Sequence, residues 1–226
     1  MAELLKRERE FVIPGEPIVE SMNYLPGKNC FREGNCIYSK IIGLVHISDR
    51  VISVIPLVGV YIPRVGDIVI GEIIDIQSSG WVVDIKSPYQ AYLSLAEGVK
   101  DFIDILKTDL SKFYDIGDLI YAKIAFITKS KSVYLSMKDV RAKKFKGGRI
   151  ISINSTKVPR LIGKAGSMIN LIKSKTNCKI VIGQNGLIWL QGEKEEKAIK
   201  AIKTIEKESQ IDGLTDKIEK LLEEGD

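Results

Sequence analysis

The chain of 226 residues has no apolar run close to the length of a membrane-spanning helix, and it has very few histidines and cysteines. A helix needs about 20 consecutive apolar residues to cross a bilayer, and residues 1–11 carry too many charges for the apolar core of a signal peptide. We therefore expect a cytoplasmic protein. Its 45% hydrophobic and 28% charged residues are the balance of folded domains with real cores.

The shortage of histidine and cysteine also argues against several kinds of chemistry. Cys30 and Cys36 have no second pair of ligands, Cys178 lies far away, and His46 is the only histidine. Structural zinc sites use four such ligands at close paired spacings, so we expect reduced thiols, no metal and no cofactor. The sequence also shows no serine or cysteine signature to pair with the histidine, no P-loop spacing and no cluster of carboxylates. We expect that the chain is not an enzyme.

The net charge of +5 and the isoelectric point near 8.9 make the chain mildly basic. This balance favours a polyanionic partner but is shared by many unrelated proteins. The most basic segment runs from Arg141 to Arg149 and includes Lys143, Lys144 and Lys146. Such a segment can follow a phosphate backbone or form a solvated linker, and its composition does not decide between the two.

Three regions differ in their patterns. Residues 1–64 contain two runs dense in β-branched residues, Ile37–Ile47 and Val51–Ile62. Loops rich in proline and glycine precede them, which predicts a small sheet after a long irregular lead-in. Residues 65–140 contain five short strand patterns with one longer interruption, and a Gly-Asp pair precedes the first and the fourth. That outline predicts a barrel of the OB type.

The third region, residues 147–226, predicts the order strand, helix, helix, strand, strand, helix. The last helix, expected over residues 193–209, carries an apolar stripe of Ile199, Ile202 and Ile205. A shorter amphipathic segment follows and can pack on this domain or on a partner. The fold class we expect is therefore mainly β plus α/β.

The most specific motif is Leu161-Ile162-Gly163-Lys164-Ala165-Gly166-Ser167, which lies between the first two expected helices. In this context the region resembles a type I KH domain (βααββα). Glycines in such a loop let backbone N–H groups approach phosphates at the positive end of the following helix. The resemblance implies RNA contact by Arg160 and by the loop residues Gly163, Lys164, Ala165 and Gly166.

The barrel region resembles the S1 RNA-binding domain, through its two Gly-Asp pairs, its Ser-Gly turn and the run Tyr134-Leu135-Ser136-Met137-Lys138. Many S1 domains carry aromatic residues at the positions of Ser79 and Val82 and a histidine at that of Ser94, and this chain has none of them. Trp81 and Tyr92 could substitute for them. Trp81 shares strand parity with Val83 and Ile85, so we expect it to be packed, whereas the sequence leaves open whether Tyr92 stacks on RNA or packs. Electrostatic RNA contact is expected instead from Lys129 and Lys131 in a polar turn, and from Lys143, Lys144, Lys146 and Arg149.

A further motif, Gly183-Gln184-Asn185-Gly186 followed by Trp189, predicts a β-turn between two strands. It also resembles a signature of exosome cap subunits, in which this turn lies against the neighbouring S1 domain. We therefore expect Gly183, Asn185, Gly186 and Trp189 to be structural. The order of the N-terminal domain, S1 and KH resembles the ribosomal RNA processing protein four family of exosome subunits, in its archaeal form.

That resemblance implies three copies, or a mixed trimer with a zinc-ribbon sibling, on a hexameric ring of RNase-PH-like subunits. The ring would degrade RNA phosphorolytically from the 3′ end, and the N-terminal domain would dock on it. The cap would bind single-stranded RNA, including adenine-rich tails. The alternative is a free-standing S1/KH factor in translation or RNA chaperoning, and an RNase in its own right is the weakest hypothesis.

Overall fold

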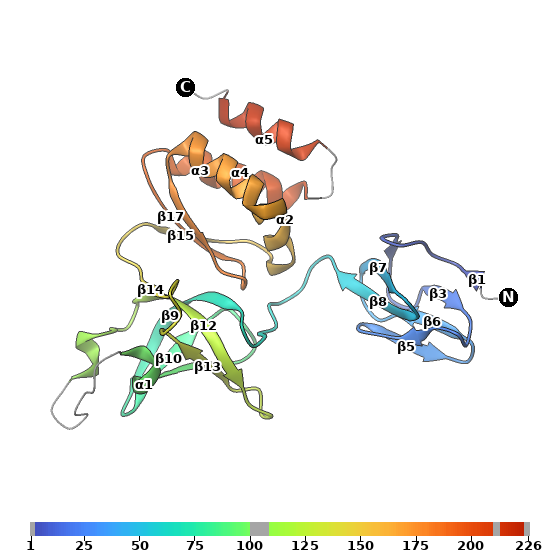
Figure 1. The fold of residues 1–226 in the computed structure, drawn as a ribbon, viewed down its shortest axis with the longest axis horizontal. Coiled ribbons are helices and arrows are strands. Elements are labelled where there is room, and N and C mark those ends of the chain that lie inside the picture. The colour runs from blue at the N-terminus through green and yellow to red at the C-terminus, as the bar shows by residue number, and fades with distance from the viewer. Residues whose placement is uncertain (1–2, 100–108, 210–212, 224–226) are drawn as a thin grey trace. The chain divides into compact units, whose positions relative to one another are not determined.

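The computed structural model describes residues 3–99, 109–209 and 213–223. Its chain divides into two compact units, Met1–Gly59 and Val60–Asp226. Figure 1 traces both from the blue N-terminus to the red C-terminus. No helix of the described part is long and apolar enough to cross a membrane.

The first unit contains two four-stranded sheets with the orders β1-β3-β6-β5 and β2-β7-β8-β4. Buried residues such as Val12, Ile37 and Ile52 form its core. The expectation of an irregular lead-in was wrong, because that segment forms strands of two to four residues between its turns. The strands of this unit are β1 (Glu3–Leu4), β2 (Phe11–Val12), β3 (Pro17–Glu20), β4 (Leu25–Pro26), β5 (Cys30–Glu33), β6 (Cys36–Ser39), β7 (Gly43–Ser48) and β8 (Val51–Pro56).

The second unit begins with a closed barrel. Its strand order is β13-β11-β10-β9-β12-β14, and pairing of β13 with β12 closes it. The core is apolar and includes Trp81, Val83, Leu93 and Ile124, all fully buried. The expected longer interruption falls partly outside the described residues. The elements are β9 (Ile68–Gln77), β10 (Gly80–Asp84), β11 (Ala91–Ser94), α1 (Leu95–Gly98), η1 (Leu110–Lys112), β12 (Leu119–Ile127), β13 (Val133–Ser136) and β14 (Lys143–Lys144).

A KH module follows, with a three-stranded sheet in the order β15-β17-β16. Alternation along β17 places Ile188 and Leu190 in the helical core, while Leu187 and Trp189 belong to a second cluster that includes residues of the barrel. The expected βααββα order is confirmed. Its elements are β15 (Arg149–Ser152), η2 (Ser155–Lys157), α2 (Val158–Ile162), η3 (Lys164–Gly166), α3 (Ser167–Thr176), β16 (Lys179–Ile182), β17 (Leu187–Gln191) and α4 (Glu195–Lys207).

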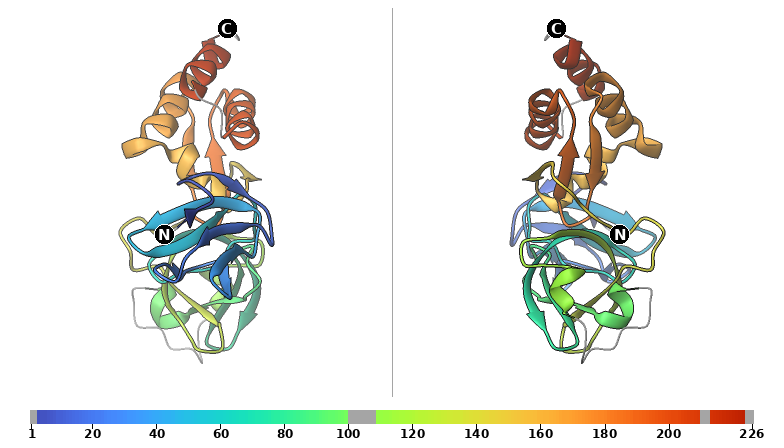
Figure 2. Two further views of the ribbon diagram at one scale, coloured as in Figure 1. Left: turned by 90° about the vertical axis from the view of Figure 1, so that its right-hand side faces the viewer. Right: turned by 90° about the vertical axis from the view of Figure 1, so that its left-hand side faces the viewer.

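The C-terminal helix α5 (Leu214–Glu223) packs on this module. Leu214, Ile218 and Leu222 are buried in the core shared with α3 and α4. Lys175 of α3 adds an ion pair of 2.7 Å to Glu223. Figure 2 shows α3, α4 and α5 next to one another in both views. Of the two possibilities left open for this segment, the structure shows packing on its own domain.

Candidate nucleic-acid interface

The Gly-Lys-Ala-Gly loop connects α2 to α3 through a backbone that side chains tolerate poorly. Gly163 has a φ of 74°, and a Cβ there would lie 2.9 Å from the backbone nitrogen of Met168. Gly166 has a φ of 80°. Only glycine adopts such conformations without cost, so both positions are fixed by the turn between the helices. The loop therefore has no side chain at either glycine, and it lies directly before the N-terminus of α3.

The two residues between these glycines are exposed. Lys164 and Ala165 both face solvent, and Ala165 has a φ of 49°. Arg160 on α2 is also exposed. The N-terminus of α3 carries the positive end of the helix dipole, and Lys164 adds a full charge beside it. The four loop residues thus lie at the N-terminus of α3, where backbone N–H groups suit a phosphate group, and Arg160 lies on α2, the helix that leads into the loop.

The Gly-Gln-Asn-Gly turn lies between β16 and β17, and it contacts the barrel. Asn185 is 5% exposed. Its amide nitrogen donates to the carbonyl oxygens of Ile70 (2.7 Å) and Ile85 (2.9 Å), and its Oδ1 accepts from the amide of Ile70 at 3.3 Å. Gln184 exchanges two further hydrogen bonds with the backbone of Ile68, of 2.8 and 2.9 Å.

Glycine is required on both sides of Asn185. A Cβ on Gly183 would lie 2.8 Å from the amide nitrogen of Ile70, and one on Gly186 would lie 2.3 Å from the carbonyl oxygen of Ile153. The missing side chain of Gly183 lets the turn approach the barrel, whereas that of Gly186 lets the turn fit against the KH segment at Ile153. We call this contact between the KH module and the barrel the joint. Trp189 belongs to it, stacks on Phe145 with 4.7 Å between ring centroids, and donates to the carbonyl oxygen of Gly147 at 2.7 Å.

The basic segment is largely built into this joint and does not form a plain linker. Lys143 and Lys144 form β14, which pairs with β12, and the next residue, Phe145, is buried. Lys144 is bonded to the carboxylate of Asp118, and the ammonium of Lys143 lies 5.3 Å from the centroid of the Phe145 ring. These two lysines already have intramolecular partners, so they are less suited to RNA contact than exposed lysines.

The rest of the basic segment is more open. Lys146 is exposed, whereas Arg149 is exposed but forms an ion pair of 3.4 Å with Glu195. The turn between β12 and β13 contains the other two predicted lysines, Lys129 and Lys131, and both are exposed. Hydroxyl groups hold this turn, since Thr128 Oγ1 accepts from the amide of Ser132 at 3.0 Å. The predicted cations therefore lie at separate places on the barrel and the KH module.

Trp81 is buried, as its strand parity predicted. It is 0% exposed, its Nε1 donates to the carbonyl oxygen of Tyr114 at 2.9 Å, and the two rings meet edge to face. It is therefore unavailable to a base. Tyr92, the other aromatic residue considered from the sequence, lies on the outside of the barrel. Sequence reasoning missed Phe126 and Tyr134 beside it, and the ring of Tyr134 contacts those of both Tyr92 and Phe126. We name these three residues the aromatic ledge.

The N-terminal unit presents an apolar patch that the sequence did not reveal. Phe11, Leu44 and Ile55 lie side by side across β2, β7 and β8. Ile13, Ile42 and Leu57 lie just beyond the ends of these strands, the amide of Leu57 donates to the carbonyl oxygen of Ile42, and Ile42 is 53% exposed. We name these six residues the apolar grid. Exposed apolar side chains that are contiguous in this way mark surfaces for protein partners.

The same sheet is polar next to the grid. The carboxylate of Glu8 lies 3.0 Å from Nδ1 of His46 and accepts from the amide of Ile47 at 2.6 Å. The hydrogen bond from His46, followed by that from Ile47, lowers the pKa of Glu8 below its ordinary value of 4.5. His46 thus has a structural partner. Among the described residues, no three histidine, cysteine or acidic side chains come together in a way that could hold a metal ion.

Three family models match the chain in succession. The model described as "Exosome RNA binding protein RRP4 N-terminal domain" covers residues 9–58, "RRP4, S1 domain" covers residues 60–125, and "KH domain" covers residues 148–207. The exosome complex component Rrp4 of Thermococcus kodakarensis is 46% identical over 98% of this chain and 88% of its own length. The chain belongs to the Rrp4 family.

Other Rrp4 proteins agree with this assignment. The exosome complex component Rrp4 of Pyrococcus abyssi is 48% identical over 98% of this chain and 85% of its own, and that of Picrophilus torridus is 43% identical over 95% and 93%. A crystal structure of a protein proposed to be an exosome complex RNA-binding protein superposes with a TM-score of 0.68 at 36% identity. It covers 74% of this chain and 97% of that one. The S1 and KH resemblances seen in the sequence are thereby confirmed.

Proposed function

We propose that this chain is the RNA-binding cap subunit of an exosome and has no catalytic activity of its own. It recruits single-stranded RNA, including adenine-rich 3′ tails, to a hexameric ring of RNase-PH-like subunits. That ring degrades the RNA phosphorolytically from the 3′ end. Three copies, or a mixture with a zinc-ribbon sibling, sit on one ring.

The observation that carries the proposal is that one compact unit of this Rrp4-family chain contains both an S1 barrel and a KH module with a glycine-rich loop. The KH loop offers a phosphate site at the N-terminus of α3, with Lys164 in the loop and Arg160 on the preceding helix. The joint at Asn185 keeps the barrel and the KH module in contact. Weak sites on such a body gain affinity when one RNA engages several of them, and again when copies assemble.

The apolar grid supports docking on a protein partner. Phe11, Ile13 and Ile55 are about half exposed, at 51%, 50% and 46%. Burying apolar surface yields about 25 cal/mol per Å², so side chains of this size are suited to an interface core. A free-standing RNA-binding factor would gain nothing from leaving such a patch open to solvent. The grid therefore favours the exosome cap over the free-standing alternative.

The test combines degradation with assembly. The chain alone, the RNase-PH-like ring alone and their mixture are incubated with a 3′ adenine-rich RNA and phosphate, and each sample is run on size exclusion. We expect no degradation by the chain, co-elution with the ring, and faster decay in the mixture. Separate elution with unchanged decay would overturn the cap assignment, and degradation by the purified chain would overturn its non-catalytic role.

Two variants test the KH loop and the apolar grid separately. Lys164→Asp with Ala165→Asp places carboxylates at the phosphate site, and aspartate tolerates the left-handed backbone of position 165. We expect RNA affinity to fall at least about tenfold, with ring binding unchanged. Gly163 is not used, because a side chain there would strain the loop.

Ile55→Asp tests the grid, with Val51→Asp as its control on the same face of β8 outside the grid. We expect the first to abolish co-elution with the ring while RNA binding is kept, and the second to change neither. Equal ring binding by both variants would remove the grid from the interface.

A further inference from the structure

The outside of the barrel carries the aromatic ledge at a place where a single-stranded ligand can reach it. The rings of Phe126 and Tyr134 are stacked, with centroids 4.3 Å apart and an interplanar angle of 8°. Tyr92 meets Tyr134 edge to face at 5.9 Å. Pairing across the strands places them in one row, with Tyr92 opposite Tyr134 and Tyr134 opposite Phe126.

The ledge is not part of the barrel core. Leu93, Val133 and Leu135 alternate with the ledge residues and are buried, whereas Phe126 is 51% exposed and both tyrosines are partly exposed. Leaving a large apolar ring half in water costs free energy that burial elsewhere would recover. An exposed, stacked aromatic pair on a folded barrel is therefore a candidate binding surface.

A bulge in β12 creates the ledge. The pairing with β13 shifts between Ile124 and Phe126, so Ala125 is the extra residue and Phe126 lies opposite Tyr134. Without the shift, Ala125 would lie there and the stacked pair would not exist. Bulges re-aim side chains and are frequent beside binding sites.

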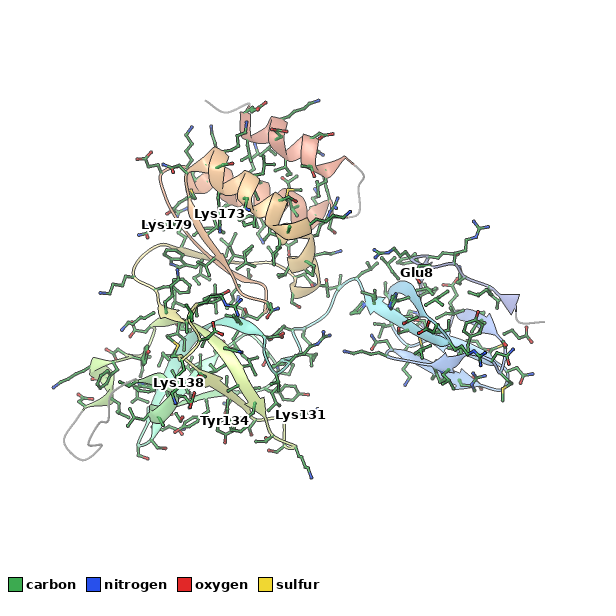
Figure 3. All side chains as sticks on the ribbon, in the orientation of Figure 1. Glu8, Lys131, Tyr134, Lys138, Lys173 and Lys179 are labelled. Atoms are coloured by element: carbon green, nitrogen blue, oxygen red, sulfur yellow. The ribbon has the colours of Figure 1, made fainter. Side chains whose placement is uncertain are left out.

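The surroundings of the ledge fit a nucleic acid better than an apolar partner. The turn that connects β12 to β13 carries the exposed Lys129 and Lys131, and Figure 3 labels Tyr134 and Lys131 along this hairpin. The hydroxyl of Tyr92 lies 2.7 Å from that of Ser79, which gives the rim a polar edge. Glu72, Asp75 and Asp84 are the acidic residues exposed on β9 and β10. Aromatic faces beside mobile cations are how proteins hold unpaired bases and their phosphates.

We propose that the aromatic ledge is the base-stacking site of this barrel and takes consecutive unpaired bases of single-stranded RNA. Phe126 and Tyr134 supply the stacking faces, and Lys129 and Lys131 supply cations for the adjoining phosphates. The proposal rests on the function proposed above and specifies where the barrel grips the RNA. The site takes over from the positions of Ser79, Val82 and Ser94, which have no aromatic side chain here.

The test is RNA binding by the full-length chain, measured by fluorescence anisotropy with labelled oligoadenylate and with an oligomer of abasic ribose phosphate of equal length. We expect Phe126→Ala with Tyr134→Ala to weaken oligoadenylate binding by about 5- to 150-fold, because each stacked base contributes about 1–3 kcal/mol. Binding of the abasic oligomer should not change. Lys129→Ala with Lys131→Ala should instead weaken binding of both oligomers and reduce the salt dependence of the RNA affinity.

The matched control is Phe31→Ala with Tyr38→Ala, which removes a second stacked pair, at 5.5 Å, from the N-terminal unit. It should leave RNA affinity unchanged. Phe126→Trp keeps a stacking face and should retain binding. Thermal unfolding of each variant checks that it is folded. If the double variant is unstable, Phe126→Ala alone replaces it in the binding assay.

Wild-type affinity in the ledge variant, or an equal loss with the abasic oligomer, would overturn the ledge and leave the proposed function intact. Failure of the wild-type chain to bind any RNA would overturn both.

Discussion

Asn185 holds the KH module to the barrel, and its replacement by alanine is a direct test of that joint. The substitution removes three hydrogen bonds to the backbone of Ile70 and Ile85, in a place that is 5% exposed. Each bond contributes about 0.5–1.5 kcal/mol net, and a buried group left without a partner costs about 1–3 kcal/mol. We expect the free energy of unfolding of the second unit to fall by about 3–5 kcal/mol.

Two tryptophans provide the assay. Trp81 lies in the barrel core and Trp189 in the joint, so Trp189→Phe and Trp81→Phe backgrounds report on each place separately during denaturant unfolding. In the parent chain both probes should show one transition. In Asn185→Ala the Trp189 signal should change at a lower denaturant concentration than the Trp81 signal, because the joint opens before the barrel.

The matched control is Asn170→Ala, the same truncation on the exposed face of α3, which should change stability by less than about 0.5 kcal/mol. Asn185→Asp makes the test sharper. Its carboxylate would face the carbonyl oxygens of Ile70 and Ile85, so the folded state would raise its pKa. Stability should therefore recover as pH falls through that raised pKa, because the protonated acid can donate again. A loss below about 1 kcal/mol in Asn185→Ala would refute the assignment of the joint to this residue.

Three further predictions concern other parts of the chain. Trp81→Phe should lower the free energy of unfolding by about 1–3 kcal/mol, because the indole donor to Tyr114 is buried, and should leave RNA affinity unchanged; a loss of affinity would contradict its packed role. Ile218→Ala should cost about 2–4 kcal/mol in chemical unfolding of the KH module, whereas Lys220→Ala on the same helix should cost little. Glu8→Gln should lower the melting temperature at pH 7, and its difference from the parent chain should shrink as pH falls below 4.5. The folded state lowers the pKa of Glu8, so its stabilisation is present above 4.5 and disappears as pH falls through the lower folded value. A difference that does not change with pH would contradict this.

Patterns that depend on local chemistry were predictable. The KH order of elements, the buried Trp81 and the turn at Gly183–Gly186 all follow from spacing and parity that neighbouring residues determine. Tyr134 could also have been recognised, because it alternates with Val133 and Leu135, which are buried. A signal of this kind needs only the period of two along a strand.

The ledge itself could not be predicted, because the bulge breaks that period. Ile120, Ala122 and Ile124 are buried in alternation, and the same parity would place Phe126 in the core. The shift at Ala125 turns it outward. Bulges arise from pairing between strands, and a single strand's sequence does not contain that information.

The N-terminal unit shows a second limit. The run Ile37–Ile47 looks like one strand but is split between β6 and β7, which belong to different sheets. Likewise, the run Val51–Ile62 gives a strand only as far as Pro56. Short strands obtain their stability from tertiary contacts, so β-branched density overestimates their length.

The joint at Asn185 has a consequence for RNA capture if both proposed sites are used. Lys164 and Ala165 of the KH loop are exposed even though Asn185 holds the barrel against the module. The barrel can therefore be held without blocking the loop. Because the two sites are already ordered relative to each other, an RNA long enough to touch both pays little additional ordering entropy for the second contact. Asn185→Ala should then weaken binding of a long oligoadenylate while leaving binding of a short one unchanged. Equal effects on both lengths would mean that the joint stabilises the fold without contributing to avidity.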